Sequence, residues 1–442
     1  MPQPRLGAEA EFERQIRALQ AEKRLPSVSA AVFRGRELVW QFAVGLADAQ
    51  QGIEATPDTQ YRVGSITKTF TAAAILQLRD AAELDIAAPI AEHVPELPDR
   101  RATIKDALAH ASGLQREEPG AEWEPIGFIQ REELFQRLGE VERVLEPRDE
   151  WHYSNVAYAL LGEVVARVSG QPYEHYVEER LFAPAGLERT TWEPSQGAAV
   201  GYHNEPWTDV VHVEDPVDLR GGRPAGQLWS TTPDLARWGA FLRDPPPDAL
   251  RPETAAEMRR VQTVADHRTW RLASGLGLIL YRSGDRVFAG HSGGMNGFLA
   301  HLAFEAHGET GTALLTNTSG AQFSVDSAGI DLAVKAAELV APASEPWRPG
   351  EAPPPELEGV LGNWWTEGWE FVFTYRDGKL RAGAVGSRFD PAVFEREAPD
   401  RYRTISGRER GELLEVVRDG DGRPVKMTWA TYPLTRTSLP MS

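Results

Sequence analysis

A serine and a lysine lie three residues apart in the stretch Val63-Gly64-Ser65-Ile66-Thr67-Lys68-Thr69-Phe70. The residues that follow predict a long helix over positions 65–83, and side chains three positions apart share one face of a helix. The Lys68 amine can therefore reach back to the Ser65 hydroxyl. Ser65 would also occupy the first helical turn, where unpaired backbone N–H groups favour negative charge. A desolvated lysine that takes the proton of a neighbouring serine is one known way to make that serine a nucleophile.

The serine–lysine pair also has a simpler interpretation. The chain contains 19 serines and 6 lysines, so one such spacing can arise by chance and would then mark a helix N-terminus with a solvated lysine. Each lysine nevertheless stands out, because the arginines number 41. The pair gains weight from residues elsewhere in the chain that would complete a site.

The composition restricts the class of protein. With 442 residues, the chain can form one large domain and a smaller one, and 41% hydrophobic and 25% charged residues are typical of a soluble globular protein. A net charge of −18 argues against nucleic-acid or anionic-membrane partners. The absence of cysteine excludes disulfides, thiol nucleophiles and thiolate metal sites. The histidines show no metal-ligand spacing, so we expect no metal or other cofactor.

The sequence also bears on location. Residues 1–22 contain no apolar run of the kind found in a secretory signal, and no stretch approaches 18 uninterrupted apolar residues. We therefore predict a cytoplasmic protein without a membrane span.

The order of predicted elements indicates an α+β fold. An amphipathic helix over 8–22 and a hairpin over 27–44 come first, helices dominate the middle of the chain, and strands return near the end. The later strands are expected at 275–281, 286–289, 297–304 and 311–316, followed by a helix over 324–340. This order predicts an antiparallel sheet that both chain ends complete, flanked by helices and with an inserted helical subdomain.

Three segments have a composition that sets them apart. Residues 115–128 form a loop rich in Glu, Pro and Gly that carries Trp123; a lid over a site and an ordinary surface loop are equally compatible with it. Six prolines among residues 341–358 predict a stiff linker. Short β-type runs and turns such as Arg376-Asp-Gly-Lys379 predict a small all-β domain over 359–442. The first domain would then comprise residues 1–340.

Two further stretches supply polar groups that suit a catalytic site. The first is Tyr153-Ser154-Asn155, in which a phenol or phenolate beside a lysine could relay a proton and an amide could hold a substrate carbonyl or the lysine. The second is Gly290-His291-Ser292-Gly293-Gly294, at the edge of a predicted strand. Glycine there allows a substrate to approach closely, and a backbone N–H can serve an oxyanion hole.

Together these stretches resemble the three boxes of the serine β-lactamase and penicillin-binding-protein superfamily. Ser65-Ile-Thr-Lys68 matches the first box, Tyr153-Ser-Asn155 the Tyr-x-Asn form of the second, and His291-Ser-Gly293 a His form of the third. The likeness covers about residues 12–340 and is greatest to the class C β-lactamases, D-alanyl-D-alanine carboxypeptidases, D-aminopeptidases and family VIII esterases. Flanking stretches share it, namely His110-Ala-Ser-Gly-Leu114, Tyr158-Ala-Leu-Leu-Gly162, Phe182-Ala-Pro-Ala-Gly-Leu187 and Leu228-Trp-Ser-Thr231.

The resemblance implies a role for each matched residue. Ser65 would be acylated, with Lys68 and Tyr153 activating it and passing its proton to the leaving group. The backbone N–H groups of Ser65 and Gly294, beside Gly293, would form the oxyanion hole. Asn155 would orient the substrate and Lys68. His291 would contact the far end of the substrate or Tyr153, and water would complete hydrolysis.

One departure from the β-lactamase pattern bears on the substrate. The β-lactamases usually carry lysine where this chain has His291, and a histidine is mostly neutral at pH 7. The sequence therefore favours an esterase or peptidase acting on a small molecule or peptide. A true class C-type β-lactamase and an inactive binding or scaffold protein of the same fold are the alternatives. Without a G-x-S-x-G motif, an α/β-hydrolase is disfavoured.

The C-terminal β-domain resembles the lipocalin-type barrels that follow some peptidases of this group. The likeness rests on length, position and Trp364-Trp365. A structural role or assembly of a homo-oligomer through this domain is favoured over lipid binding.

Overall fold

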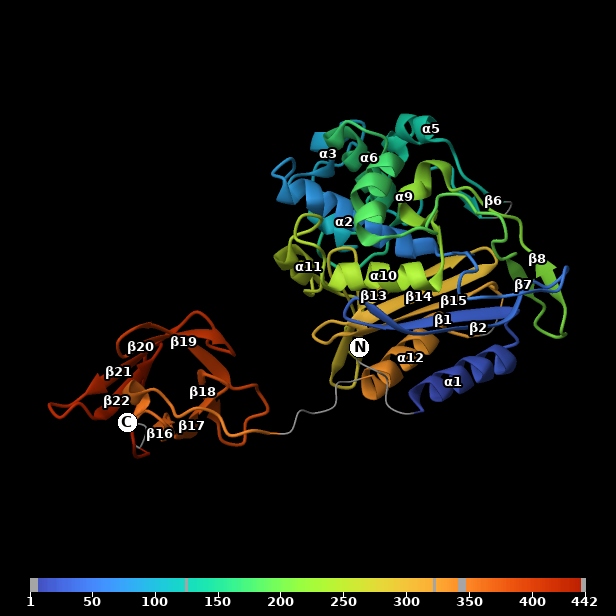
Figure 1. Cartoon of the computed structure of the whole chain (residues 1–442). Helices are drawn as coiled ribbons and strands as arrows, with labels where there is room; N and C mark the ends of the chain where they lie inside the picture. The colour runs from blue at the N-terminus through green and yellow to red at the C-terminus, as the bar shows by residue number, and fades with distance from the viewer. Residues whose placement is uncertain (1–6, 124–125, 321–322, 341–346, 439–442) are drawn as a thin grey trace. The chain divides into compact units, whose positions relative to one another are not determined.

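The chain divides into two compact units, Met1–Pro342 and Ala343–Ser442. The computed structural model, drawn in Figure 1, describes residues 7–123, 126–320, 323–340 and 347–438. Part of the predicted linker, residues 341–346, lies outside the described residues, as does the side chain of Trp123.

A nine-stranded antiparallel sheet forms the centre of the first unit. Its strand order is β10-β11-β12-β13-β14-β15-β1-β2-β3. The strands run over β1 (Ser27–Arg34), β2 (Glu37–Asp48), β3 (Ile53–Glu54), β10 (Thr263–Val264), β11 (Leu272–Ser274), β12 (Ile279–Ser283), β13 (Arg286–Met295), β14 (Phe298–Glu305) and β15 (Thr310–Thr316). Because β1 pairs with β15 on one side and β2 on the other, both ends of the chain complete the sheet, as the sequence predicted.

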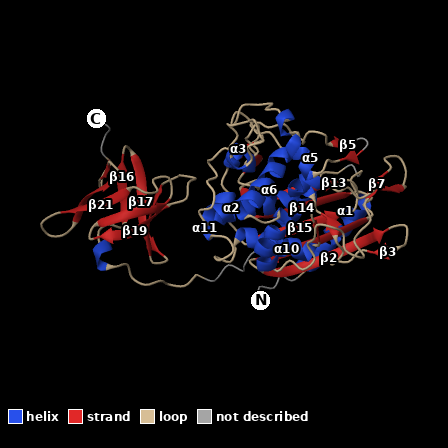
Figure 2. Cartoon of the chain, turned by 90° about the horizontal axis from the view of Figure 1, so that it is seen from above, coloured by secondary structure: helices blue, strands red, loops and turns tan. Residues whose placement is uncertain are grey.

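Helices cover both faces of this sheet. The first helix α1 and the last helix α12 lie on one face, and α10 lies on the other, below the helical region that contains α2 and α6 (Figure 1). Figure 2 looks at this unit from above, so that the helical region in blue lies over part of the sheet in red. The helices run over α1 (Ala8–Glu22), α2 (Thr67–Asp80), α3 (Ile90–His93), α4 (Ile104–Leu108), α5 (Arg131–Gln136), α6 (Asn155–Ser169), α7 (Tyr173–Val177), α8 (Ala183–Ala185), α9 (Arg223–Gly226), α10 (Thr232–Arg243), α11 (Pro252–Met258) and α12 (Val325–Leu339).

One predicted helix differs from the structure at its start. The helix predicted over 65–83 begins as a 3₁₀ turn, Gly64–Ile66, and becomes α-helical only at Thr67. Gly64 has a positive φ of 51°, which glycine adopts without strain, so the chain turns sharply into the helix. Farther along the chain, a π-helical turn, Glu178–Phe182, joins α7 to α8.

Short strands and turns complete the first unit outside the main sheet. They are β4 (Tyr61–Arg62) with β9 (Trp229–Ser230), β5 (Glu122–Trp123) with β6 (Ile126–Gly127), β7 (Tyr202–Asn204) with β8 (Val211–Val213), and the 3₁₀ turns Leu138–Glu140 and Arg220–Gly222.

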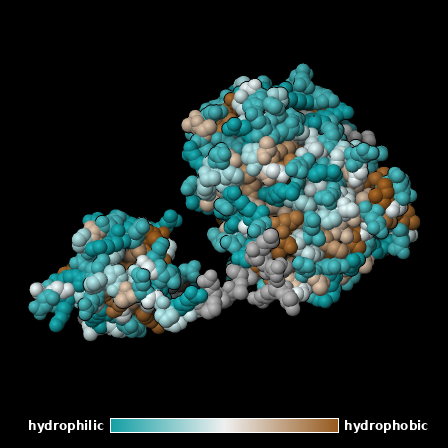
Figure 3. All heavy atoms as spheres, viewed as in Figure 1, coloured by the Kyte–Doolittle hydropathy of each residue, from teal (hydrophilic) through white to brown (hydrophobic). Residues whose placement is uncertain are grey.

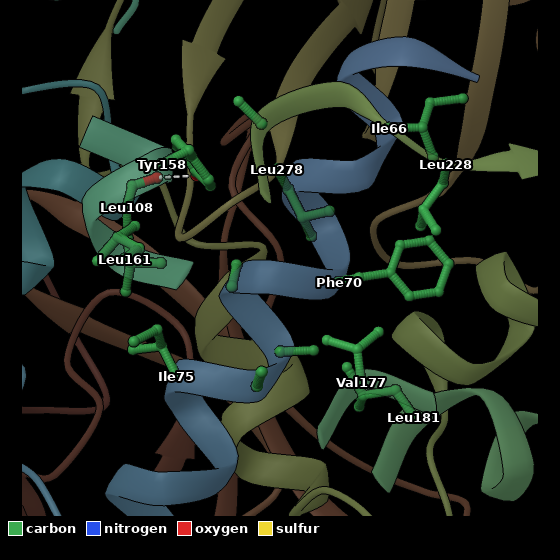
Figure 4. Close-up of a cluster of buried hydrophobic side chains, with 14 of the residues drawn as sticks. Ile66, Phe70, Ile75, Leu108, Tyr158, Leu161, Val177, Leu181, Leu228 and Leu278 are labelled. Atoms are coloured by element: carbon green, nitrogen blue, oxygen red, sulfur yellow. Dashed lines mark hydrogen bonds between the residues drawn. The ribbon is translucent and has the colours of Figure 1, made fainter. Parts of the chain in front are cut away.

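Helix α2 is buried along most of its length. The Phe70 ring stacks on Trp238 of α10 with centroids 3.8 Å apart and meets Phe182 edge-on. Figure 4 shows Phe70 and Ile75 among apolar side chains from other parts of the unit, with the Tyr158 hydroxyl donating to the Leu108 carbonyl. Packing on several sides fixes the helix, and with it the positions of the residues at its N-terminus.

The second unit is a nearly closed antiparallel barrel of eight strands in sequence order. They are β16 (Gly362–Thr366), β17 (Trp369–Arg376), β18 (Lys379–Ala384), β19 (Ala392–Ala398), β20 (Arg401–Ser406), β21 (Leu413–Arg418), β22 (Pro424–Trp429) and β23 (Tyr432–Leu434), preceded by a 3₁₀ turn, Pro355–Leu357. Trp365 and Thr435 exchange backbone hydrogen bonds of 2.8 and 2.9 Å, which joins the last part of the chain to the first strand. Buried side chains including Trp364, Phe373 and Met427 form its core.

The surface is mainly polar. Hydrophilic residues predominate on the face of each unit seen in Figure 3, with hydrophobic ones scattered between them. In the part of the chain that the structure describes, no helix is long and apolar enough to cross a membrane.

Replacing Phe70 by alanine should destabilise the first unit by about 3–5 kcal/mol, because it leaves a cavity against Trp238. Calorimetry of the full chain should then show a transition several degrees lower. Trp207→Ala is the control, since Trp207 is 88% exposed and its removal creates no cavity. Equal shifts in the two variants would contradict a structural role for the Phe70 stack.

Candidate active site

Ser65 and Lys68 meet where the chain enters α2. The Lys68 Nζ lies 3.2 Å from the Ser65 Oγ, as their spacing on adjoining helical turns requires. Lys68 is fully buried, although Ser65 lines a cavity. The predicted pairing is therefore present in the fold, with the amine on the protein side of the hydroxyl.

The other partners of Lys68 determine what its amine can do. Its Nζ also lies 2.7 Å from the Asn155 Oδ1 and 2.7 Å from the Ala225 carbonyl oxygen. Both oxygens can only accept, so each takes one N–H of the amine. A neutral lysine has two N–H bonds and one lone pair, and the lone pair then faces the Ser65 hydroxyl. This arrangement suits a base.

The protein environment favours that neutral form. Burial lowers the pKa of Lys68 to about 7; the charges of Glu117 and Glu118 oppose this shift and that of Arg116 assists it. A substantial fraction of Lys68 is therefore unprotonated near neutral pH, which a general base requires.

Tyr153 is held between several neighbours. Its ring stacks on His110 with centroids 4.2 Å apart, while the Arg116 guanidinium carbon lies 5.0 Å from the ring centroid. Burial raises the pKa of Tyr153 well above its usual value, and a hydrogen bond with Ser65 opposes the shift. The side chain is thus a neutral phenol, so of the two forms that the sequence left open, the structure favours the one that can donate a proton.

Asn155 is oriented from both sides. Ser154 caps α6, because its hydroxyl accepts from the Ala157 N–H at 3.1 Å. The Asn155 Nδ2 lies 2.9 Å from each carboxylate oxygen of Glu117, which can only accept. The amide nitrogen therefore faces Glu117 and the amide oxygen faces Lys68.

The glycines of the third box bring two backbone segments together. A Cβ on Gly293 would lie 1.9 Å from the Val63 carbonyl oxygen and 3.1 Å from the Ser65 nitrogen. A Cβ on Gly64 would lie 2.9 Å from the Gly294 nitrogen. Only glycine permits this approach of β13 to the turn that carries Ser65. The backbone nitrogens of Ser65 and Gly294 are thereby brought to one place.

His291 lies on β13 beside Tyr153, with ring centroids 6.2 Å apart. Its Nδ1 lies 2.5 Å from the Ser292 carbonyl oxygen, and its buried Nε2 has no hydrogen-bond partner. Burial, assisted by the Lys68 charge, lowers the pKa of His291 to about 4. The imidazole is therefore neutral at pH 7, unlike a lysine at this place.

These groups surround one cavity of about 1130 Å³ in the first unit. Ser65, Tyr153, Asn155, His291 and Gly294 all line it, while Lys68 and Gly293 lie behind its wall. The loop that could have been a lid or a surface feature contributes lining residues, namely Arg116, Glu117, Glu118 and Phe128.

Several lining groups were not anticipated from the sequence. Glu117, the Ala225 carbonyl, Tyr281 and Asp326 come from segments without a recognisable motif. The acidic pair Glu117-Glu118, which follows the flanking stretch 110–114 after two residues, was the one available signal. A backbone carbonyl such as that of Ala225 gives no signal in the sequence, because every residue has a carbonyl. His110 packs on Tyr153 and so positions a site residue.

Comparison with known proteins identifies the family. The model of the β-lactamase family matches residues 12–335, and the chain belongs to this family. Residues 353–436 match a domain of unknown function (DUF7586). The superfamily resemblance read from the three boxes is thus confirmed, and so is the fold class.

Individual relatives are distant. A putative penicillin-binding protein, PbpX, of Bacillus subtilis (strain 168) is 30% identical over 224 residues, which are 49% of this chain and 55% of that protein. The chain thus spans little more than half the length of this relative. A D-stereospecific amidohydrolase from Streptomyces sp. is similar in structure, with a TM-score of 0.62 and 25% identity over 73% of this chain and 98% of that one. An octameric penicillin-binding protein homologue from Pyrococcus abyssi has a TM-score of 0.66 and 21% identity, covering 97% and 99%.

If Lys68 is the base, acylation of Ser65 should follow its titration. The rate of labelling by a fluorophosphonate should rise about ten-fold per pH unit below 7 and level off above it, because the unprotonated amine increases with pH. Lys68→Ala should lower this rate on the order of 10²–10⁴-fold.

The matched control is Glu118→Gln, because burial raises the pKa of Glu118 to about 7 as well. This variant should keep the inflection but move it to lower pH, because the Glu118 charge no longer favours the Lys68 ammonium. If the inflection is lost in Glu118→Gln and retained in Lys68→Ala, the titration belongs to Glu118, which would contradict the role of Lys68 as the base.

Proposed function

We propose that the protein is a serine hydrolase that cleaves ester or amide bonds through an acyl-enzyme, as an esterase or peptidase and not as a β-lactamase. The observation that carries the proposal is the arrangement of the Lys68 amine, whose two N–H bonds are taken by acceptors while its lone pair faces Ser65. An inactive scaffold has no need for a buried lysine in that state, since burial of a cationic side chain is costly.

Acylation would begin when Lys68 takes the proton of the Ser65 hydroxyl. The Ser65 oxygen then forms a bond to the substrate carbonyl carbon, and negative charge develops on the carbonyl oxygen. The backbone N–H groups of Ser65 and Gly294 would stabilise that charge, which requires no reorganisation because the glycine contacts already fix both segments.

The leaving group needs a proton as its bond to carbon breaks. Tyr153 is a neutral phenol that hydrogen-bonds with Ser65, so it can pass a proton to the leaving group and regain one from the Lys68 ammonium. In deacylation, water would lose a proton to the same pair and attack the ester carbon. The Ser65 oxygen then leaves and is protonated again, which restores the resting state.

The neutral His291 supports the choice of substrate class. A carboxylate such as that of a cephalosporin binds best to a cation, and a charged hydrogen bond contributes roughly 1.5–3 kcal/mol. His291 supplies no charge at pH 7. The similarity in structure to the D-stereospecific amidohydrolase from Streptomyces sp. agrees with amide cleavage.

We expect the protein to hydrolyse some p-nitrophenyl esters or D- or L-amino-acid anilides, with slow or absent turnover of a chromogenic cephalosporin. Ser65→Ala should reduce hydrolysis to the background rate, and intact-mass spectrometry should show one fluorophosphonate adduct, on Ser65. The matched control is Ser283→Ala, because Ser283 lines the same cavity and is followed three residues later by Arg286 instead of lysine.

The alternatives give different results in this experiment. Efficient cephalosporin hydrolysis would favour the β-lactamase, and the absence of both adduct and turnover would favour the binding or scaffold protein. An adduct on Ser112 or Ser230 would reject Ser65 as the nucleophile.

The second proposal concerns the domains: residues 341–358 act as a linker, and the barrel beyond it contributes no catalytic group but forms a homo-oligomer. The catalytic candidates all lie in the unit Met1–Pro342, and an octameric homologue resembles both units in fold. Truncation after Pro342 should keep fluorophosphonate labelling of Ser65 within about three-fold of the full chain, while light scattering should show a smaller assembly. Loss of labelling in a folded truncated protein would contradict the claim that the barrel contributes no catalytic group. An assembly of unchanged size would contradict the claim that the barrel forms the homo-oligomer.

A further inference from the structure

A second group of polar residues lines the active-site cavity and has no part in the acyl chemistry. It consists of His291, Ser292, Tyr281 and Asp326. The first turn of α12 brings Asp326 to β12, where the Tyr281 hydroxyl lies 2.8 Å from the Asp326 Oδ1. Ser292 also hydrogen-bonds to Tyr281. We refer to these four residues as the acceptor wall.

The tautomer of His291 follows from its surroundings. Its Nδ1 lies 2.5 Å from a carbonyl oxygen, that of Ser292, and a carbonyl oxygen can only accept. The Nδ1 of the neutral ring therefore carries the hydrogen, and the Nε2 carries a lone pair. His291 is only 3% exposed, and this Nε2 is unpartnered although the residue lines the cavity. A buried acceptor without a partner is costly, so a donor from a bound ligand would satisfy it.

Asp326 adds a negative charge to the same wall. Its position in the first turn of α12 stabilises the carboxylate, and 46% of its side-chain surface stays exposed. Its charge also acts on His291, where it opposes the lowering of the pKa. Burial lowers the pKa of the adjacent His301 to about 4, so His301 supplies no cation to Asp326.

Two arginines that line the cavity leave this charge unpaired. Arg271 lines the cavity from the residue before β11, and Arg282 lines it from β12. Among the residues that the structure describes, no salt bridge joins either of them to Asp326.

The acceptor wall lies on the side of the leaving group. Under the proposed function, on which this step rests, the leaving group departs toward its proton donor, Tyr153. The His291 ring is 6.2 Å from the Tyr153 ring, whereas Glu117 approaches the site from Asn155. We propose that the leaving group of the substrate carries a primary ammonium that donates to the His291 Nε2 and pairs with Asp326. A carboxylate at that place would face a lone pair and a negative charge.

Three matched ligands test this inference by binding alone. They are amides of one acyl group, chosen from the best p-nitrophenyl ester, with an N-(3-aminopropyl), N-butyl or N-(3-carboxypropyl) group. Their affinities for the full-length Ser65→Ala protein can be measured by calorimetry, because this variant does not consume them. We expect the aminopropyl amide to bind at least about ten-fold more tightly than the butyl amide, and the carboxypropyl amide to bind most weakly.

Variants of the acceptor wall show which of its residues cause the preference for the aminopropyl amide. In the Ser65→Ala background, Asp326→Asn should reduce the aminopropyl preference about ten-fold while it keeps an acceptor for Tyr281, and Asp326→Glu should retain most of it. His291→Lys should shift the preference toward the carboxypropyl amide. The control is Glu253→Gln, which removes one exposed carboxylate outside the cavity and should change nothing.

An equal or reversed order of the three amides in the parent protein would overturn the inference, as would an unchanged preference in Asp326→Asn. These results are independent of the proposed function, because ester turnover and Ser65 labelling are measured separately on the protein with Ser65 intact. If the protein with Ser65 intact hydrolyses esters but the three amides bind in a different order, only the inference about the acceptor wall is rejected.

Discussion

The buried Lys68 amine is the constraint on which the rest of the site depends. A lysine is stable inside a protein only where its N–H bonds have acceptors or where it loses its charge. Here the Asn155 amide oxygen and the Ala225 carbonyl oxygen each accept a hydrogen bond from the Lys68 amine. The Ser65 hydroxyl occupies the third position around that nitrogen. Each of these partners comes from a different segment, so the helical region must pack in one way for the lysine to be accommodated.

The packing around α2 provides that arrangement. The helix is buried among aromatic and aliphatic side chains, and the Phe70–Trp238 stack joins it to α10, which rests on the sheet. On the other side, Gly293 brings β13 against the backbone of the Ser65 turn. Ser65 thus lies at the boundary between the helical region and the sheet, where both can contribute polar groups to one cavity.

The charges around the cavity are not uniform. Glu117 and Glu118 lie near Lys68, Asp326 lies beyond His291, and burial keeps the imidazole neutral. A site with this pattern of charges differs in its electrostatics from a site with lysine in place of His291, although the backbones of the two sites would be similar. Within one fold, the replacement of one cation by a neutral acceptor therefore changes which substrates can bind, which is why the fold alone does not define the reaction.

The sequence by itself determined the parts of this protein that depend on local spacing. The serine–lysine pair follows from the helical repeat, the sheet strands from alternating apolar runs, and the three boxes from short motifs. Helix boundaries were less certain, since the chain forms a 3₁₀ turn at Gly64–Ile66, where it also lies in close contact with β13. Tertiary structure alone decided which residues complete the site. Ala225 lies 157 residues from Lys68 in the chain and contributes only a backbone oxygen, and Asp326 meets Tyr281 across 45 residues. The tautomer of His291 is likewise set by the carbonyl of Ser292, because a side chain takes its hydrogen-bonding role from the atoms that the fold places around it.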